Sequence, residues 1–320
     1  MNLGKPTISV VVPVFNEQES IAETIRRLLG LQATHQSDVD FEFVFVFVDD
    51  GSKDSSLAQL RAAADANPSI KVISLSRNFG HQIAITAGID HAQGDFVSVI
   101  DADLQDPPEL IYDMYQIARQ GADVVYGQRR TRSGETAFKK ATAAAFYRVL
   151  RYMCDIDIPA DTGDFRLMSR RATDALKTMR ERHRFVRGMV TWLGYKAVPL
   201  EYDRAERFAG ETKFPLRKMM AFASNAILSF SSKPLTLAIR LGFITLLAGL
   251  LGGGYLVYLK LFTDKTVPGL TAVLLSIVLF SGIQIMLIGV VGEYIARIFD
   301  EVKGRPLYLV GEIINLPRHT

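Results

Sequence analysis

This chain of 320 residues has a single cysteine and lacks the common glycine-rich phosphate-binding motifs. Its one cysteine, Cys154, excludes an internal disulfide and is typical of a protein in a reducing compartment. No Gly-x-Gly-x-x-Gly motif follows the first apolar run, which argues against a dinucleotide-dependent dehydrogenase. The absence of a Gly-x-x-x-x-Gly-Lys-Ser/Thr motif argues against a Walker-type nucleotide triphosphatase. Any bound phosphate must therefore be held by a metal ion and by side chains.

Charged residues are missing from two long stretches near the C-terminus, between Leu241 and Leu259 and between Thr266 and Gly292. Each stretch is long enough to cross roughly 30 Å of hydrocarbon. A pair of buried core helices fits these lengths and their glycine content less well. We therefore divide the chain into a large N-terminal domain, an amphipathic segment at the membrane surface, two transmembrane helices and a cytosolic tail. These parts cover residues 1–213, 214–234, 235–260, 266–293 and 296–320, in that order.

The short connection between the two apolar runs predicts a hairpin whose ends lie on the same side of the membrane. Basic residues flank both ends, so the positive-inside rule assigns these ends to the cytoplasm. Residues 1–13 show no feature of a signal peptide, and the N-terminal domain is therefore expected in the cytosol. The chain is predicted to be a multi-pass protein of the inner or plasma membrane with both termini cytoplasmic. For residues 214–234, a helix packed on the N-terminal domain is the alternative to a membrane-surface helix.

Short apolar runs alternate with segments of helical spacing through the N-terminal part. Five runs predict strands, at residues 7–14, 41–48, 70–75, 95–100 and 122–126. Four segments between them predict helices, at residues 18–29, 55–66, 82–92 and 108–120. Continuous apolar strands separated by helices indicate a Rossmann-like α/β fold, with a mostly parallel sheet and helices on both faces. Residues 306–316 also have strand-like composition, and predict a small hairpin or an intersubunit strand.

Two closely spaced acids follow the apolar run Val97–Ile100. Asp101 and Asp103 stand at the carboxyl end of a predicted strand, where open parallel sheets bind their ligands. Carboxylate oxygens suit Mg²⁺ or Mn²⁺, and such ions usually share the phosphate oxygens of a substrate. Asp106, which precedes two prolines, is expected to cap the next helix. The pattern therefore predicts a metal-bound phosphate at this strand end.

A second group of acids follows the predicted strand at residues 41–48. Here Asp50 could accept a hydrogen bond from a nucleobase or a ribose, while Asp54 could cap the next helix. Because the carboxyl ends of parallel strands meet at one sheet edge, the acids of both strands are predicted to converge on one cleft. None of the five histidines has metal-ligand spacing, and His81 alone merits a test, because it follows the segment Arg77–Gly80.

Four segments stand in the order in which a known enzyme family has its motifs: Pro13–Glu17, Asp49–Asp54, Arg77–Gly80 and Asp101–Pro108. Together they resemble the inverting glycosyltransferases of family 2, which have the GT-A fold. The resemblance covers most of the N-terminal domain, and it implies that residues 1–213 are a cytosolic GT-A catalytic domain. With two C-terminal spans, the chain is most similar to the polyprenyl-phosphate glycosyltransferases. That group includes the bactoprenol glucosyltransferases and the dolichol-phosphate mannose synthases.

The resemblance also implies roles for individual residues. Asp101, Asp103 and Gln105 would bind the divalent metal, Mg²⁺ or Mn²⁺. Asp103 is the strongest candidate for a direct ligand and for a catalytic role. The nucleotide sugar would contact the loops that follow the strands and a basic lid before the membrane. The residues assigned to it are Pro13, Phe15, Glu17, Asp50, Asp101, Ala102, Asp103, Gln105, Arg207 and Lys213.

A second set of assignments concerns the acceptor. Basic residues near the end of the fifth predicted strand would bind a lipid phosphate, with a solvated basic face as the alternative. They are Arg129, Arg130 and Lys139. Asp157 or Asp161 would serve as catalytic base or orienting group, although cap or turn roles are equally expected for Asp161 and Asp164. Arg166 would be a diphosphate partner or a structural residue.

These assignments predict a hexosyltransferase that moves a sugar to undecaprenyl or another polyprenyl phosphate at the cytosolic membrane face. UDP-glucose is the expected donor, and GDP-mannose and UDP-4-amino-arabinose derivatives are the alternatives. Attack opposite the departing nucleotide converts an α-linked donor into a β-linked lipid product.

Two other kinds of protein, and two kinds of partner, are also considered. A non-catalytic subunit that binds nucleotide sugars at the membrane is the alternative from another class. A processive polysaccharide synthase is disfavoured because the chain has no Gln-x-x-Arg-Trp motif. The formal net charge of +3 does not favour long nucleic acid as a partner. Glycines such as Gly249 and Gly252–Gly254 would allow close helix packing in a homo-oligomer.

Overall fold

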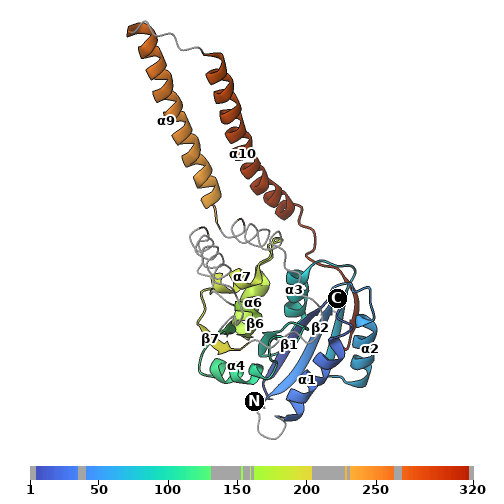
Figure 1. The fold of residues 1–320 in the computed structure, drawn as a ribbon. Helices are drawn as coiled ribbons and strands as arrows, with labels where there is room; N and C mark the ends of the chain where they lie inside the picture. Colours follow the sequence, from blue (N-terminus) through green and yellow to red (C-terminus); the bar gives the residue numbers. More distant parts are fainter. Residues whose placement is uncertain are drawn as a thin grey trace.

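Within the part of the chain that the structure describes, eight strands form one sheet (Figure 1). The computed structural model describes residues 5–34, 41–130, 153, 159, 162–203, 228, 231–262 and 269–316. The strands are β1 (Thr7–Val14), β2 (Glu42–Asp49), β3 (Ile70–Leu75), β4 (Phe96–Val99), β5 (Val124–Arg129), β6 (Thr162–Ser169), β7 (Ala197–Tyr202) and β8 (Val310–Ile314). The helices are α1 (Ile21–Thr34), α2 (Ser56–Ala66), α3 (His81–His91), α4 (Leu110–Arg119), α6 (Arg170–Thr178), α7 (Val186–Trp192), α9 (Lys233–Phe262) and α10 (Leu270–Val302).

Strand β1 lies inside the sheet, whose order is β7-β5-β6-β4-β1-β2-β3-β8. It pairs in parallel with β2, where Val10 is opposite Phe45, and with β4, where Val10 is opposite Ser98. Every side chain of β1 except that of Thr7 is buried, as expected of a parallel strand that is covered on both faces. The predicted α/β fold, with a mostly parallel sheet and helices on both faces, is confirmed.

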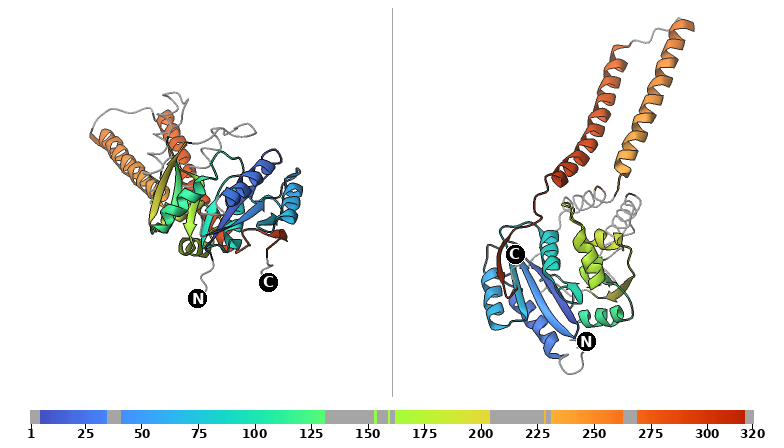
Figure 2. Two further views of the ribbon diagram at one scale, coloured as in Figure 1. Left: turned by 90° about the horizontal axis from the view of Figure 1, so that it is seen from below. Right: turned by 180° about the vertical axis from the view of Figure 1, so that it is seen from behind.

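The helices form two layers because successive side chains of a strand point to opposite faces of the sheet. Helices α1, α2 and α4 pack on one face, in a core that includes Val10 and Phe45. Helices α3, α6 and α7 pack on the other face, in a core that includes Val11 and Val48. The two layers are visible in Figure 2. The loops that follow β1, β2 and β4 therefore emerge together at one edge of the sheet, between the layers.

Gly88 allows α3 to approach the sheet closely, and its replacement by alanine is expected to destabilise the domain. A Cβ atom at this position would lie 2.2 Å from Cγ1 of Val11 and 3.0 Å from Cγ2 of Val48. Overpacking of this kind costs about 1–3 kcal/mol. Gly30, inside α1, is the matched control: a Cβ there meets nothing within 4 Å, and Gly30→Ala is expected to stabilise the helix by up to about 1 kcal/mol. Thermal melts of the two variants check this, and a Gly88→Ala protein as stable as the parent would contradict it.

Strand β6 makes the sheet mixed. It inserts antiparallel between β4 and β5, so that Arg166 lies opposite both Val99 and Tyr126. This strand was not predicted, because charged residues such as Asp164 and Arg166 interrupt its apolar pattern. Both side chains are nevertheless buried, at 4% relative exposure each. Charges buried in this way need partners, and those partners lie at the candidate site.

The chain returns from its long helices to add β8 to the edge of the sheet. β8 pairs antiparallel with β3, and Ile73 lies opposite Ile313. The Asn315 side-chain amide donates a hydrogen bond to the carbonyl oxygen of Ala64 at 2.7 Å. Residues 296–320 were predicted to be a C-terminal tail, and in the structure this stretch contains the end of α10 and the sheet strand β8. The segment is neither the small hairpin nor the intersubunit strand that its composition suggested, because its partner is β3 of the same chain.

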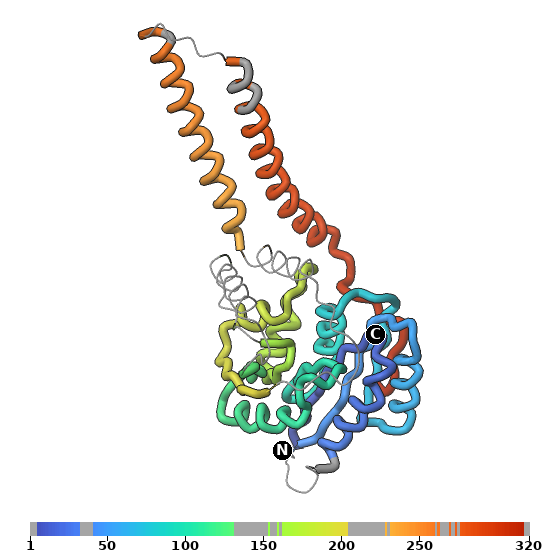
Figure 3. Tube along the Cα trace, in the orientation of Figure 1, coloured from blue at the N-terminus to red at the C-terminus, as the bar shows by residue number. Residues whose placement is uncertain are grey.

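Helices α9 and α10 are long and apolar enough to cross a membrane. The stretches with this property are Lys233–Leu259 and Ser276–Val302. Their described side chains are largely exposed, and both helices extend away from the sheet (Figures 1 and 3). Together these features indicate association with a membrane. Two transmembrane spans were predicted here, at residues 235–260 and 266–293, and their bounds stay a prediction.

The C-terminal end of α10 is attached to the N-terminal domain by hydrogen bonds. The backbone N–H of Arg182 donates a hydrogen bond to Oε1 of Glu301 at 2.7 Å. Just beyond the helix, the Tyr308 hydroxyl donates to Oδ2 of Asp90, in α3, at 2.9 Å. Helix α10 is therefore attached on the face of the sheet that α3, α6 and α7 cover.

Candidate active site

The loop after β1 is tied to the loop after β2 at the carboxyl edge of the sheet. The backbone N–H of Asn16 donates to Oγ of Ser52 at 3.0 Å, and the backbone N–H of Lys53 donates to Oδ1 of Asn16 at 2.9 Å. Asn16 has a φ of 54°, in the left-handed region that asparagine tolerates better than most residues. The two loops therefore hold each other in place. Phe15, next to Asn16, has 43% of its surface exposed.

The other residues predicted near this loop lie deeper. Pro13 is buried inside β1, opposite Val48 of β2. The Glu17 carboxylate accepts a hydrogen bond from the Ser20 hydroxyl at 2.6 Å, and the Glu17 backbone N–H donates to Oγ of Ser56 at 2.9 Å. Phe15 is thus the most exposed of the three residues that were assigned to the nucleoside in this loop.

Asp50 anchors the segment Arg77–Gly80. Its two carboxylate oxygens accept hydrogen bonds from the backbone N–H groups of Phe79 and Gly80 at 2.7 and 2.9 Å. Burial raises the pKa of Asp50, and the two hydrogen bonds oppose this rise. Gly51 permits the approach of the two segments: its φ is +68°, and a Cβ atom there would lie 2.6 Å from the backbone of the anchored segment. A direct contact between Asp50 and a nucleoside stays a prediction.

Asp101 and Asp103 follow β4 in a tight turn at the same edge of the sheet. Oδ1 of Asp103 accepts a hydrogen bond from the backbone N–H of Gln105 at 3.1 Å. Ala102, between the acids, is buried, and its carbonyl oxygen accepts a hydrogen bond from the Thr24 hydroxyl at 2.8 Å. The turn is therefore fixed from both sides, and it carries the three predicted metal ligands, Asp101, Asp103 and Gln105.

The acid pair suits a hard divalent cation. Oδ1 of Asp101 is buried and makes no hydrogen bond within the described residues. Burial raises the pKa of Asp101 to about 6, and nearby carboxylates, Asp164 first among them, add to the rise against the opposing charge of His81. A cation here would supply the missing positive charge. Among the residues described, no group of three or more His, Cys, Asp or Glu side chains could hold a metal alone. Two acids suffice for Mg²⁺, which usually keeps waters and binds substrate phosphates as well.

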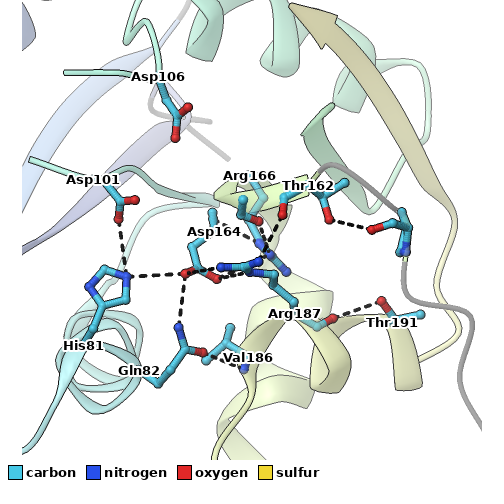
Figure 4. Close-up of polar contacts among 12 residues, drawn as sticks. His81, Gln82, Asp101, Asp106, Thr162, Asp164, Arg166, Val186, Arg187 and Thr191 are labelled. Carbon is cyan, nitrogen blue, oxygen red and sulfur yellow. Dashed lines mark hydrogen bonds and ion pairs between the residues drawn. The ribbon is translucent and has the colours of Figure 1, made fainter. Parts of the chain in front are cut away.

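His81 lies between the acid pair and β6 (Figure 4). It is the first residue of α3, and its Nε2 atom lies 3.4 Å from Oδ1 of Asp101 and 3.3 Å from Oδ2 of Asp164. Although burial opposes the protonated ring, the hydrogen bond to Asp164 and the charge of Asp101 raise the pKa of His81 to about 9. The histidine that the sequence singled out therefore contacts one of the predicted metal ligands.

Asp164 is the centre of a buried charge cluster. The Arg187 guanidinium, from α7, donates to its two oxygens at 2.9 and 3.3 Å, and the Gln82 amide donates to Oδ2 at 3.1 Å (Figure 4). Arg166 donates to the carbonyl oxygens of Gly163 and Asp164 at 2.9 and 3.1 Å. Although burial opposes ionisation, the charge of Arg187 holds the pKa of Asp164 well below its usual range. Burial lowers the pKa of Arg166 to about 10. The cluster ties β6 to α3 and α7.

Asp106 lies inside the domain, and the expected capping role is corrected. Its carboxylate accepts a hydrogen bond from the Tyr202 hydroxyl and lies 3.8 Å from the Arg129 guanidinium. Helix α4 has Glu109 at its N-cap position, with no capping hydrogen bond from a side chain. A buried carboxylate is costly unless it has partners, and Tyr202 and Arg129 provide them here.

Two of the three basic residues assigned to the acceptor phosphate are described. The side chain of Arg129, at the end of β5, is 22% exposed and lies beside Asp106. The side chain of Arg130 is 57% exposed, and its Nε lies 3.4 Å from a carboxylate oxygen of Glu201 in β7. Arg129 therefore belongs to the same group of side chains as Asp106, whereas Arg130 forms an ion pair on the surface.

Several sequence assignments lie outside the described residues, and they stay predictions. They are Asp157, Asp161, Lys139, Arg207, Lys213 and most of the amphipathic segment at residues 214–234. Sequence reasoning also missed three residues of the site. They are Gln82, Arg187 and Tyr202. Each stands in an ordinary helix or strand pattern, and only the fold brings it to the charged residues, so no local signal could have found it.

Solved structures with a related architecture share little sequence with this chain. One is the glucosyl-3-phosphoglycerate synthase of Mycobacterium tuberculosis, crystallised with Mg²⁺ and uridine diphosphate. It is 20% identical, with a TM-score of 0.47, over 70% of this chain and 77% of that structure.

Relatives by sequence are much closer and extend over nearly the whole chain. The glycosyltransferase YkcC of Bacillus subtilis, whose function is uncharacterized, is 52% identical over 302 residues, which are 94% of this chain and 92% of that protein. The SfII prophage-derived bactoprenol glucosyl transferase of Shigella flexneri is 39% identical over 95% of this chain and 97% of its own length. The prophage bactoprenol glucosyl transferase homolog of Escherichia coli K12 is 38% identical over 96% and 99%. Residues 9–177 match glycosyl transferase family 2. The chain is therefore a glycosyltransferase and belongs to that family.

Proposed function

We propose that this glycosyltransferase moves a single hexose, glucose from UDP-glucose, to undecaprenyl or a similar polyprenyl phosphate at the cytosolic face of the membrane. The observation that carries the proposal is the acid pair Asp101 and Asp103 in a domain that continues into two long apolar helices. Relatives with 38% and 39% identity that are named for bactoprenol glucosyl transfer support both the lipid acceptor and the glucosyl group.

The donor would bind at the carboxyl edge of the sheet. Asp101 and Asp103, with Gln105 beside them, would hold Mg²⁺ or Mn²⁺, which neutralises the negative charge that develops on the departing diphosphate. Phe15 has an exposed ring that suits stacking on a nucleobase. The fixed loops around it would limit the entropy lost on binding, because they are already held by Asn16, Ser52 and Asp50.

The acceptor needs little activation. A phosphate oxygen of the lipid attacks the anomeric carbon, the bond from that carbon to the diphosphate breaks, and the nucleoside diphosphate leaves with the electron pair. Because a phosphate monoester is largely ionised at neutral pH, no proton has to be removed from it. Arg129, beside Asp106, is the described cation best suited to attract the lipid phosphate. Attack from the side opposite the diphosphate gives a β-linked product from an α-linked donor.

The membrane helices would bring the lipid to the site. Helix α10 is attached on the sheet face that carries α3 and α7, through contacts such as the one between Arg182 and Glu301. His81 of α3 and Arg187 of α7 lie on that same face, near the acid pair. A lipid phosphate at the bilayer surface would therefore have a short path to the donor.

The experiment that tests the proposal is a donor screen with the purified full chain in detergent. Undecaprenyl phosphate and Mn²⁺ are held constant, and UDP-glucose, UDP-galactose, UDP-4-amino-4-deoxy-arabinose and GDP-mannose are supplied one at a time. We expect a lipid product from UDP-glucose. A product from GDP-mannose alone would replace the donor in the proposal. Tight donor binding without any product would instead favour the non-catalytic membrane subunit.

A further inference from the structure

The proposed reaction gives no task to the imidazole of His81, although this ring touches a predicted metal ligand. Its Nε2 atom lies 3.4 Å from Oδ1 of Asp101 and 3.3 Å from Oδ2 of Asp164, and 48% of the side chain is exposed (Figure 4). Asp101 stands in the turn after β4, and Asp164 belongs to β6. His81 therefore bridges the metal-binding turn and the buried charge cluster.

We propose that His81 is a positioning residue, which holds the Asp101 carboxylate in the orientation that binds a divalent cation. The inference rests on the proposed function, in which Asp101 and Asp103 hold the metal. It goes further, because it assigns the fine geometry of the site to a side chain that need not touch metal, donor or acceptor.

Within the described part of the chain, few contacts other than that with His81 orient the Asp101 carboxylate. Its Oδ1 atom makes no hydrogen bond within the described residues, although it is buried. The carboxylate of Asp103 differs, because it accepts a hydrogen bond from the backbone N–H of Gln105 at 3.1 Å. The contact with His81 is thus the specific interaction that fixes Oδ1 of Asp101.

His81 itself is held in place by the residues on either side of it. The preceding backbone is anchored, because the N–H of Gly80 donates to Asp50 at 2.9 Å. The following residue, Gln82, is bound at both ends of its amide: Nε2 donates to Asp164 at 3.1 Å, and Oε1 accepts from the backbone N–H of Val186 at 2.9 Å. The ring therefore stands on a part of α3 that has little freedom to shift.

Asp164, the other carboxylate that His81 contacts, is also fixed. Asp164 is 4% exposed, and Arg187 holds both of its oxygens. Through His81, the fixed position of Asp164 thus determines the position of the Asp101 carboxylate in the metal-binding turn. Removing such supporting contacts typically weakens metal affinity by about 10–100-fold.

The experiment measures Mn²⁺ affinity directly, by electron paramagnetic resonance of free Mn²⁺ with UDP present, on the full chain in detergent. His81→Ala is expected to raise the dissociation constant for Mn²⁺ by about 10-fold or more. His81→Gln retains an N–H donor near the position of Nε2 and is expected to restore most of the affinity. His81→Asn, whose amide is too short, is not expected to restore it. His91→Ala, at the other end of α3, is the matched control and should leave the affinity unchanged.

Glucosyl transfer by the parent chain is measured in parallel, so that the two hypotheses fail separately. Transfer by the parent together with an unchanged Mn²⁺ affinity in His81→Ala would overturn the positioning role alone. A lower melting temperature without a change in affinity would do the same, since it would show a purely structural role. Equal losses of Mn²⁺ affinity in His81→Gln and His81→Ala would also contradict the proposal.

The parent chain tests the underlying assignments. Absence of Mn²⁺ binding by the parent chain would overturn the positioning role together with the metal assignment. Absence of transfer despite Mn²⁺ binding would overturn the proposed function alone.

Discussion

Asp103→Ala is expected to lower the rate of glucosyl transfer by about 10³-fold or more and to leave the fold intact. Loss of one group that stabilises developing charge typically costs a factor of about 10²–10³, and loss of a metal ligand removes both the metal and its charge. The domain should tolerate the change, because Asp103 is half-buried in a turn and its described hydrogen bond is local, to Gln105. Initial rates at several Mn²⁺ concentrations provide the measurement.

The control for this variant is Asp113→Ala, which removes an exposed carboxylate from α4. It should retain the parent's rate, because the side chain is exposed on α4 and is not among the residues assigned to the site. Melting temperatures of both variants should lie within about 4 °C of the parent, as expected for changes of up to about 1 kcal/mol in a domain of this size. An Asp103→Ala protein with more than a tenth of the parent's rate would contradict the metal assignment.

Asp164→Ala is expected to destabilise the domain more than any surface substitution. The variant leaves the buried Arg166 and the partly buried Arg187 without the carboxylate that they share. Breaking a buried ion pair by removing one partner costs about 3–5 kcal/mol. For a domain of this size that corresponds to a fall in melting temperature of roughly 6–20 °C. Asp164→Asn keeps the shape but not the charge, and most of the loss should persist.

Asp174 provides the comparison for this second prediction. Its side chain is 58% exposed and lies 3.3 Å from Arg170, one helical turn away. Exposed pairs of this kind contribute about 0–1 kcal/mol, so Asp174→Ala should melt close to the parent. Similar melting temperatures for Asp164→Ala and Asp174→Ala would show that the buried cluster does not stabilise the domain.

The contribution of Asp164 also has a defined pH dependence. Its pKa in the folded protein lies well below the usual value, so the folded state favours the ionised form. The stabilisation is therefore fully present above about pH 5 and is lost as the pH falls through the folded pKa. The difference between the parent and Asp164→Ala should accordingly shrink in strong acid. It should also shrink as the pH rises from about 6.5 through the pKa of His81, about 9, because the hydrogen bond to Asp164 stabilises protonated His81.

Much of the fold could be predicted from the sequence because its signals are local. The apolar runs of β1 to β4 alternate with helices, and that alternation alone indicates a largely parallel sheet. The acids Asp101 and Asp103 are adjacent to a strand end, and strand ends are where such sheets bind ligands. The two long apolar helices could likewise be predicted, because each contains a long uncharged stretch of sequence.

What could not be predicted depends on contacts between distant residues. Strand β6 contains Asp164 and Arg166, and two charged residues so close together are typical of a polar turn. They are tolerated in a buried strand because Arg166 and Arg187, from α7, both interact with Asp164. Strand β8 pairs with β3 across most of the length of the chain, and its composition does not reveal its partner. Asp106 has the sequence context of a helix cap. In the structure it is buried and accepts a hydrogen bond from the hydroxyl of Tyr202, a residue distant in the sequence.

The central claim is that a metal held by Asp101 and Asp103 assists transfer of one sugar to a lipid phosphate. The mass spectrum of the lipid fraction tests it most directly, after incubation of the purified chain with UDP-glucose, undecaprenyl phosphate and Mn²⁺. We expect one new lipid that carries a single hexose, and its loss when EDTA removes the metal. An unchanged lipid despite release of UDP, a lipid with several hexoses, or an equal yield in EDTA would contradict the claim.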